Sequence, residues 1–212
     1  GFASLASKGI ETPKDFEGKR YGGWGSEIEN ETIKVLMEAY GGDYEKVEIL
    51  TTGAADFFAT SENNADFSWI FYGWDGIAAE LKGIELNYLN VADFDETFDF
   101  YTPVIITSEK IASENKELAE KFIKATSEGY NFAINNPEEA ADILLEHAPE
   151  LDSTLVLESQ KWLSERYAGK EKAWGIQKYE VWERYTDWLV ARGLLEEKIE
   201  VGKAFTNEFL LK

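Results

Sequence analysis

The sequence contains no cysteine and only one histidine among its 212 residues. Disulfides, thiolate nucleophiles and cysteine-ligated metals are therefore excluded. His147 is far in sequence from every serine-bearing turn, so a triad of nucleophile, base and orienting group is not evident. Paired carboxylates for glycoside cleavage stay open where acids are so abundant. We predict a binding protein without catalytic residues.

Positive charge is also scarce, with 21 Lys and Arg against 41 Asp and Glu and a formal net charge of −20. A phosphate backbone or an anionic membrane surface would repel such a chain, so nucleic acid is not an expected partner. No apolar run reaches the roughly 20 residues needed to span a bilayer. The acidic run 93–96 does not have the spacing of a calcium loop. We expect no metal and no cofactor.

Against these absences stands a feature that occurs three times within the first 80 residues. A short apolar strand runs into a glycine-containing turn and then into a helix, at residues 21–26, 50–54 and 71–75. The expected strands cover residues 19–22, 46–50, 66–72 and 85–90, and the expected helices cover residues 27–40, 54–60 and 74–81. This alternation predicts an α/β fold with a parallel sheet covered by helices on both faces. Such sheets bind ligands beyond the carboxyl ends of their strands.

The second half is rich in helices. After an irregular start over residues 1–11 and the α/β pattern that follows, one more strand is expected at 104–107. Helices are then predicted over residues 115–135, from 137 onward, over 153–166 and over 175–191. Asn136 is expected to cap the second of these, with Pro137 at its first position and Glu139 completing the capping box. These apolar helix faces must be buried, either in a bundle on the first half or against further strands from residues outside this chain, and we favour the second.

The first turn carries candidate ligand contacts. Gly23 and Gly25 allow close approach of a ligand to the backbone, and Ser26 stands at a helix start where free amides point outward. Ser26 and Glu29 also have the spacing of a capping box. Trp24 either stacks on a flat ligand or covers a seam between domains.

The second and third turns add polar and aromatic groups. Thr52 either offers its hydroxyl to a ligand or caps the next helix. Phe71, Tyr72 and Trp74 lie nearest the carboxyl end of their strand and are the better site candidates among its aromatics. Asp75 either receives a ligand amine or stabilises the first helical turn. Because no arginine lies in a glycine turn, a flat and weakly charged ligand is favoured over a sulfonate or phosphate.

These motifs carry a family resemblance. The segments 13–26, 41–43, 55–58, 69–74 and 204–209 resemble the solute-binding proteins of ABC importers, in particular the group related to thiamine-pyrimidine synthesis and uptake. The resemblance implies a type II periplasmic-binding-protein fold with two α/β lobes. Residues 13–101 would form the second lobe, residues 102–212 would return into a helix-rich first lobe, and residues 1–12 would connect them. Family members are usually longer at the amino end, so we expect the first lobe to be incomplete.

The resemblance also implies a function. Such a protein binds a small-molecule solute between its lobes and delivers it to a membrane permease, and the complete form would be an extracytoplasmic, monomeric lipoprotein. The expected ligand is a thiamine pyrimidine precursor such as hydroxymethylpyrimidine, with aliphatic sulfonates, taurine or nitrate as the alternative. Related pyrimidine synthases use a cysteine-rich motif and histidine, which this sequence does not provide. That departure favours transport over synthesis.

Overall fold

The computed structural model describes residues 1–53, 56–63, 65–169 and 174–210, and these form two compact units. Unit 1 comprises Gly1–Asp99 together with Asp187–Glu197, and unit 2 comprises Phe100–Thr186 together with the chain after Glu197. The boundary therefore falls inside one helix, α8 (Tyr179–Ala191). The assignment of residues 13–101 and 102–212 to two lobes stays a prediction.

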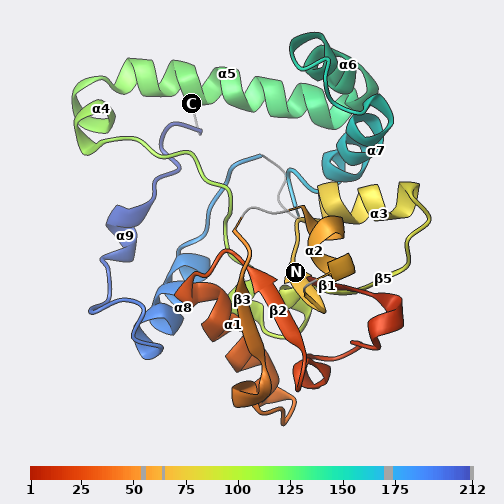
Figure 1. Cartoon of the computed structure of the whole chain (residues 1–212). Helices are drawn as coiled ribbons and strands as arrows, with labels where there is room; N and C mark the ends of the chain where they lie inside the picture. Colours follow the sequence, from red (N-terminus) through yellow and green to blue (C-terminus); the bar gives the residue numbers. More distant parts are fainter. Residues whose placement is uncertain (54–55, 64, 170–173, 211–212) are drawn as a thin grey trace. The chain divides into compact units, whose positions relative to one another are not determined.

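Unit 1 is built on a mixed sheet of short strands with the order β3-β2-β4-β1-β5 (Figure 1). The strands are β1 (Phe2–Leu5), β2 (Arg20–Gly23), β3 (Glu48–Thr51), β4 (Phe67–Trp69) and β5 (Leu86–Leu89). Strand β2 pairs in parallel with β3 and β4, whereas β1 runs antiparallel between β4 and β5. The expectations of an all-parallel sheet and of an irregular start were therefore wrong. Strand β1 has only four residues, and they are buried on both faces of the sheet. Its sequence therefore shows no alternation of apolar and polar residues from which a strand could be predicted.

Helix α1 (Glu27–Ala39) matches its prediction closely. The backbone N–H of Glu29 donates to the Ser26 hydroxyl, and the Glu29 carboxylate accepts from the Ser26 N–H, so the capping box is confirmed. Ile33, Leu36 and Met37 are fully buried on one face. After the helix, Gly41 has a φ of 69°, a left-handed conformation that glycine adopts without strain.

The remaining helices of unit 1 are short. They are α2 (Phe57–Asn63) and α3 (Ile77–Leu81), the second of which follows a π-helical turn at Tyr72–Gly76. The predicted helix 54–60 includes positions 54 and 55, which lie outside the described residues. The predicted helix 74–81 divides into the π-helical turn and α3. An i→i+5 turn widens the helix by one residue, so the side chains around it do not follow the expected spacing.

The core of unit 1 is aromatic. The Phe16 and Phe67 rings stack with centroids 4.1 Å apart, and Phe2 meets both of them edge-on. Tyr21 is buried in the same cluster. The opposite face of the sheet carries a smaller apolar cluster formed by Ala3, Phe57 and Ile70. Strand β4 therefore serves both clusters, with Phe67 on one face and its neighbours on the other.

The regular secondary structure of unit 2 is helical within its described residues. Its helices are α4 (Glu109–Glu114), α5 (Lys116–Asn135), α6 (Pro137–His147), α7 (Ser153–Ser164), the first part of α8 and α9 (Val201–Ala204). Helices α5, α6 and α7 lie against one another (Figure 1). The predicted strand at 104–107 was wrong. Its β-branched residues favour a strand, but no partner strand is present among the described residues.

Two other details of unit 2 differ from expectation. Pro137 begins α6 as predicted, but the Asn136 side chain donates to the carbonyl of Phe132 and does not cap the helix. The i, i+4 spacing of Leu118 and Phe122 on α5 predicts a buried stripe, but both side chains are more than half exposed. His147, whose place near a helix end indicates a surface residue, is exposed in the last turn of α6.

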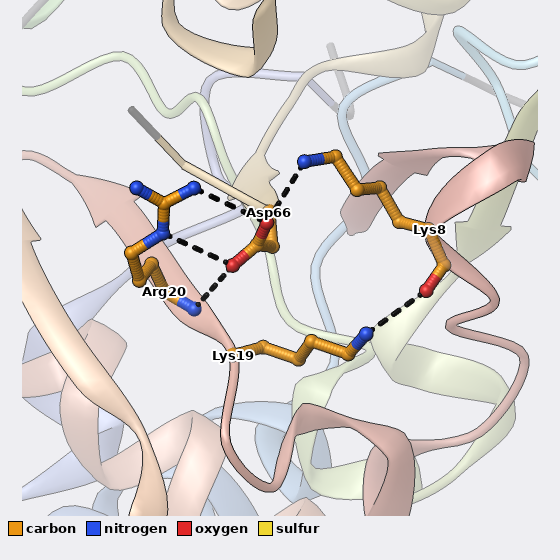
Figure 2. A network of polar contacts seen from close by, with 4 residues as sticks. All are labelled: Lys8, Lys19, Arg20 and Asp66. Atoms are coloured by element: carbon orange, nitrogen blue, oxygen red, sulfur yellow. Dashed lines mark hydrogen bonds and ion pairs between the residues drawn. The ribbon is translucent and has the colours of Figure 1, made fainter. Parts of the chain in front are cut away.

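An ion-pair network joins three segments of unit 1 around Asp66 (Figure 2). Its carboxylate accepts from Lys8 Nζ at 2.9 Å, from Arg20 Nε at 3.2 Å and from the Arg20 backbone N–H at 2.9 Å. Lys19 Nζ donates to the carbonyl of Lys8 at 3.0 Å. Burial alone would raise the pKa of Asp66, but the hydrogen bonds from Arg20 and Lys8 outweigh it and lower the pKa. Asp66 thus holds the segment after β1 to the starts of β2 and β4.

We predict that Asp66→Asn lowers the free energy of unfolding by about 1 to 3 kcal/mol at neutral pH, because buried donors lose a charged acceptor. The pKa of Asp66 is lower in the folded state than in the unfolded chain. Its contribution to the free energy of unfolding is therefore complete above about pH 4 and is lost as the pH falls further. Urea unfolding at about pH 7 and about pH 2.5 should therefore show a stability gap that narrows in acid.

Glu117→Gln is the control for this prediction. Its carboxylate pairs with Lys121 on an exposed helix face, where ion pairs contribute little to stability. An equal loss of stability in Glu117→Gln and Asp66→Asn, or a gap that does not narrow in acid, would contradict the role of Asp66.

Candidate functional site

A pocket of about 180 Å³ lies at the carboxyl ends of β2, β3 and β4. Five of the nine sequence-predicted residues line it, namely Gly23, Trp24, Thr52, Phe71 and Asp75. The three strand-glycine-helix turns therefore do converge on one place. Sequence reasoning missed further lining residues, among them Phe57, Thr60, Ser68 and Trp69.

Aromatic side chains form the outer wall of this pocket. Trp24 is 43% exposed and Phe71 is 61% exposed, and their ring centroids are 6.1 Å apart with a 37° tilt. Large apolar rings with this exposure have surface to gain by covering a ligand. Each of them offers a flat face suited to stacking.

Two consecutive glycines lie at the end of β2 beside the pocket. A Cβ at Gly22 would lie 2.8 Å from the Ala65 Cβ and 3.0 Å from the Thr60 Cγ2. A Cβ at Gly23 would overlap the Tyr21 ring and the Glu29 carboxylate. Both positions require glycine, because neighbouring atoms already fill the space that a side chain would need.

Thr52 ties the end of β3 to the end of β2. Its backbone N–H donates to the carbonyl of Gly23 at 2.9 Å, and its hydroxyl donates to the same oxygen at 3.3 Å. The suggested capping role is not observed for Thr52. Instead, Asp56 accepts from the N–H of Ala59 at the start of α2. The Thr52 hydroxyl oxygen keeps acceptor capacity at the pocket.

Asp75 is the charged group of the pocket. One carboxylate oxygen accepts from the backbone N–H of Phe71 at 3.2 Å. Burial raises the pKa of Asp75, and the negative charge of Asp56 raises it further. No lysine or arginine lines the pocket within the described part of the chain. The site therefore offers hydrogen-bond acceptors and a partly desolvated carboxylate, and no cation to balance an anionic ligand.

Four predicted residues do not line this pocket. Gly25 has a φ of 86° in the turn after β2, and the Ser26 hydroxyl donates to the Glu29 carboxylate. Tyr72 donates its hydroxyl to Glu80 at 2.5 Å and lines a separate hollow of about 640 Å³. Trp74 is 39% exposed outside the pocket. The π-helical turn explains the last two, because it places Phe71 and Asp75 together and directs the residues between them elsewhere.

The Glu29 carboxylate lies directly behind the Trp24 turn and is only 3% exposed. It accepts from the Tyr21 hydroxyl at 2.5 Å, the Trp24 N–H at 3.1 Å, the Ser26 N–H at 2.9 Å and the Ser26 hydroxyl at 2.8 Å. Burial by itself would raise the pKa of Glu29, but these hydrogen bonds outweigh it and lower the pKa. Burial raises the pKa of Tyr21, and its bond to Glu29 adds to the effect. The carboxylate thus stays ionised and fixes the turn that presents Trp24.

One missed residue had a weak signal in the sequence. Ser68 is a lone small polar residue inside an aromatic strand, and alternation places it on the face opposite Phe67 and Trp69. The contributions of Phe57 and Thr60 depend on how α2 packs against the sheet, which the sequence does not encode locally.

Other classes of site were also sought. Within the described residues, no group of three or more acidic or histidine side chains is placed to hold a metal ion. No described helix has both the length and the apolar character needed to cross a membrane.

The fold and the pocket define a class of protein. The alkanesulfonate-binding protein SsuA from Xanthomonas axonopodis pv. citri superimposes with a TM-score of 0.65 at 14% identity, covering 95% of this chain and 67% of SsuA. The desulfurization enzyme DSZB has a TM-score of 0.57 at 13% identity, covering 99% of this chain and 74% of DSZB. The fold is thus of the type II periplasmic-binding-protein kind, and it hosts both binding proteins and enzymes.

The sequence comparisons narrow this class. Residues 1–140 match the family described as NMT1/THI5 like, and the chain belongs to that family. It is 28% identical over 208 residues to the formylaminopyrimidine-binding protein of Halalkalibacterium halodurans, covering 96% of this chain and 63% of that protein. It is 33% identical over 137 residues to the riboflavin-binding protein RibY of Chloroflexus aurantiacus, covering 61% of this chain and 38% of RibY. The chain thus spans less than two thirds of either relative. Both relatives are named as binding proteins.

We predict that Glu29→Gln lowers the free energy of unfolding by about 2 to 3 kcal/mol, because buried donors lose a charged acceptor and an amide N–H faces them instead. The amide of Trp24 should then exchange with solvent faster, which hydrogen-exchange NMR can measure residue by residue.

Tyr21→Phe is the matched control, since it removes one donor and leaves the contacts of Glu29 with Ser26 and Trp24 in place. Its effect on Trp24 exchange should be smaller than that of Glu29→Gln. If Glu29→Gln leaves Trp24 exchange unchanged, the carboxylate does not fix the turn.

Proposed function

We propose that this chain acts in the solute-binding component of an ABC importer and binds a small flat nitrogen heterocycle at the ends of β2, β3 and β4. The preferred ligand is a thiamine pyrimidine precursor such as hydroxymethylpyrimidine. One observation carries the proposal: the pocket combines exposed aromatic faces with the Asp75 carboxylate and has no cation among its described lining residues.

Charge favours an amine over a sulfonate. Two like charges about 4 Å apart repel by about 4 kcal/mol at an effective dielectric constant of about 20, which is roughly a thousandfold in affinity. A sulfonate or nitrate beside an ionised Asp75 would meet this repulsion, and the pocket provides no basic group to offset it. The amino group of an aminopyrimidine would instead donate to the same carboxylate.

Size points in the same direction. Pockets for drug-sized ligands commonly enclose about 300 to 1,000 Å³, and this pocket is smaller, at about 180 Å³. A single substituted ring suits that volume. The names of the two relatives support a heterocyclic ligand. They are called binding proteins for formylaminopyrimidine and for riboflavin, and both compounds contain a planar nitrogen heterocycle.

The wider role follows from the family. We propose that Gly23, Trp24, Thr52, Phe71 and Asp75 contact the ligand, and that Gly25 and Ser26 act by shaping the turn. Tyr72 and Trp74 would contribute only to a larger ligand. The complete protein would work outside the cytoplasm as a lipid-anchored monomer, close a second lobe over its solute and deliver it to a membrane permease. Binding of taurine, another sulfonate or nitrate is the second candidate, and a hydrolytic enzyme is the third.

We predict that Trp24→Ala weakens binding of hydroxymethylpyrimidine by roughly tenfold, since stacking on an aromatic side chain contributes about 1 kcal/mol or more. Trp74→Ala is the matched control, because both tryptophans have similar exposure and only Trp24 lines the pocket. NMR titration of the 212-residue chain with the pyrimidine and with taurine measures both effects. Saturable binding of taurine without binding of the pyrimidine would refute the proposal.

Asp75 should make binding depend on pH. Its pKa is raised, so the carboxylate loses its charge at a higher pH than an ordinary aspartate, and affinity for an amino ligand should fall as the pH drops through that value. In Asp75→Asn the fall in affinity caused by protonation of Asp75 should be absent. Any change in affinity caused by protonation of the ligand should remain in that variant. The difference between the two affinity profiles isolates the carboxylate. Superimposable profiles would exclude Asp75 as a ligand contact.

A further inference from the structure

The floor of the pocket holds a buried hydroxyl without a partner. Ser68, in the middle of β4, is 5% exposed, and its Oγ makes no hydrogen bond within the described part of the chain. The residue lines the pocket beside Gly22, where a Cβ would lie 3.3 Å from the Ser68 Oγ. The Ser68 hydroxyl therefore lies at the lining of the pocket, next to a position where any side chain would crowd it.

Two other serines share this lack of a partner, but they differ from Ser68 in location. Ser4 on β1 and Ser61 on α2 are also buried with unpartnered hydroxyls, but neither lines the pocket. A buried hydroxyl without a partner costs free energy, so each of them gains from any polar atom that can reach it. Only Ser68 is placed where a ligand can supply that atom.

The neighbouring polar groups indicate whether the ligand atom that meets Ser68 is a hydrogen-bond donor or an acceptor. Ionised Asp75 can only accept hydrogen bonds, and the Thr52 hydroxyl already donates to the carbonyl of Gly23. Thr60 turns its methyl group toward Gly22. The Ser68 hydroxyl is thus a buried lining group with a proton free to donate, and it reaches other staggered positions by rotation about χ1.

We propose that Ser68 is a specificity-determining residue that donates a hydrogen bond to a ring nitrogen of the ligand, while Asp75 accepts from the ligand's amino group. This inference rests on the proposed function and narrows its ligand class. The ligand is a heteroaromatic amine with an acceptor nitrogen next to the amino-bearing carbon. A carbocyclic amine of the same shape lacks the acceptor and leaves the Ser68 hydroxyl unpaired.

The test compares two variants with two ligands. The variants are Ser68→Ala and Ser4→Ala, which both delete a buried unpartnered hydroxyl from the same sheet. The ligands are hydroxymethylpyrimidine and the aminopyridine in which the ring nitrogen next to the amino-bearing carbon is replaced by CH. Chemical-shift titration of the 212-residue chain follows weak as well as tight binding.

We expect Ser68→Ala to weaken pyrimidine binding by roughly three- to tenfold, the usual range for one neutral hydrogen bond, and to leave aminopyridine binding unchanged. Ser4→Ala should change neither affinity. Ser68→Cys keeps a weak donor at nearly the same volume and should give an intermediate affinity. Thermal unfolding of all variants checks that the sheet is intact.

Two results would overturn the inference, and they are distinguishable. If the wild-type chain binds the pyrimidine and Ser68→Ala binds it equally well, then a water molecule or nothing meets the hydroxyl, and the proposed function stands without this contact. If the wild-type chain binds taurine and not the pyrimidine, the proposed function fails and the role of Ser68 fails with it.

Discussion

The buried carboxylate of Glu29 is the constraint on which the first turn of the site depends. No cation pairs with it among the residues that the structure describes, and it is stabilised by hydrogen bonds from a strand, a turn and a helix cap. Charge-assisted bonds of this kind are roughly twice as strong as neutral ones, and together they offset the cost of burial. Because the carboxylate and the Tyr21 ring occupy the space where a Cβ at position 23 would lie, glycine is required there. The exposed position of Trp24 follows from this packing.

Strand β4 connects the core to the pocket. Phe67 stacks on Phe16 on one face, and Ser68, the next residue, turns its hydroxyl to the other. Asp66 precedes them and is held by Lys8 and Arg20. Three consecutive side chains thus hold the strand in place, pack the core and form the pocket floor. Shifting the register by one residue would exchange the last two roles, because neighbouring side chains face opposite sides of a sheet.

Local patterns predicted part of this site. The strand-glycine-helix turns, the capping box at Ser26 and the buried face of α1 are encoded within a few residues each, and the structure contains all three. Trp24, Phe71 and Asp75 were found because residues at the carboxyl end of a parallel strand reach a common edge. The π-helical turn was not predictable, since no sequence rule distinguishes it from an α-helical start. It is the reason why Tyr72 and Trp74 lie outside the pocket.

The sequence by itself determined the family to which this protein belongs. Missing cysteine, a single histidine and few basic residues limit the available chemistry whatever the fold. The tertiary structure decided what depends on distant segments: the antiparallel place of β1, the partnership of Asp66 with Lys8, and the unpaired hydroxyl of Ser68 at the pocket floor. All three depend on residues that are far apart in the chain. How such residues come together is set by the packing of the whole sheet and not by local propensity.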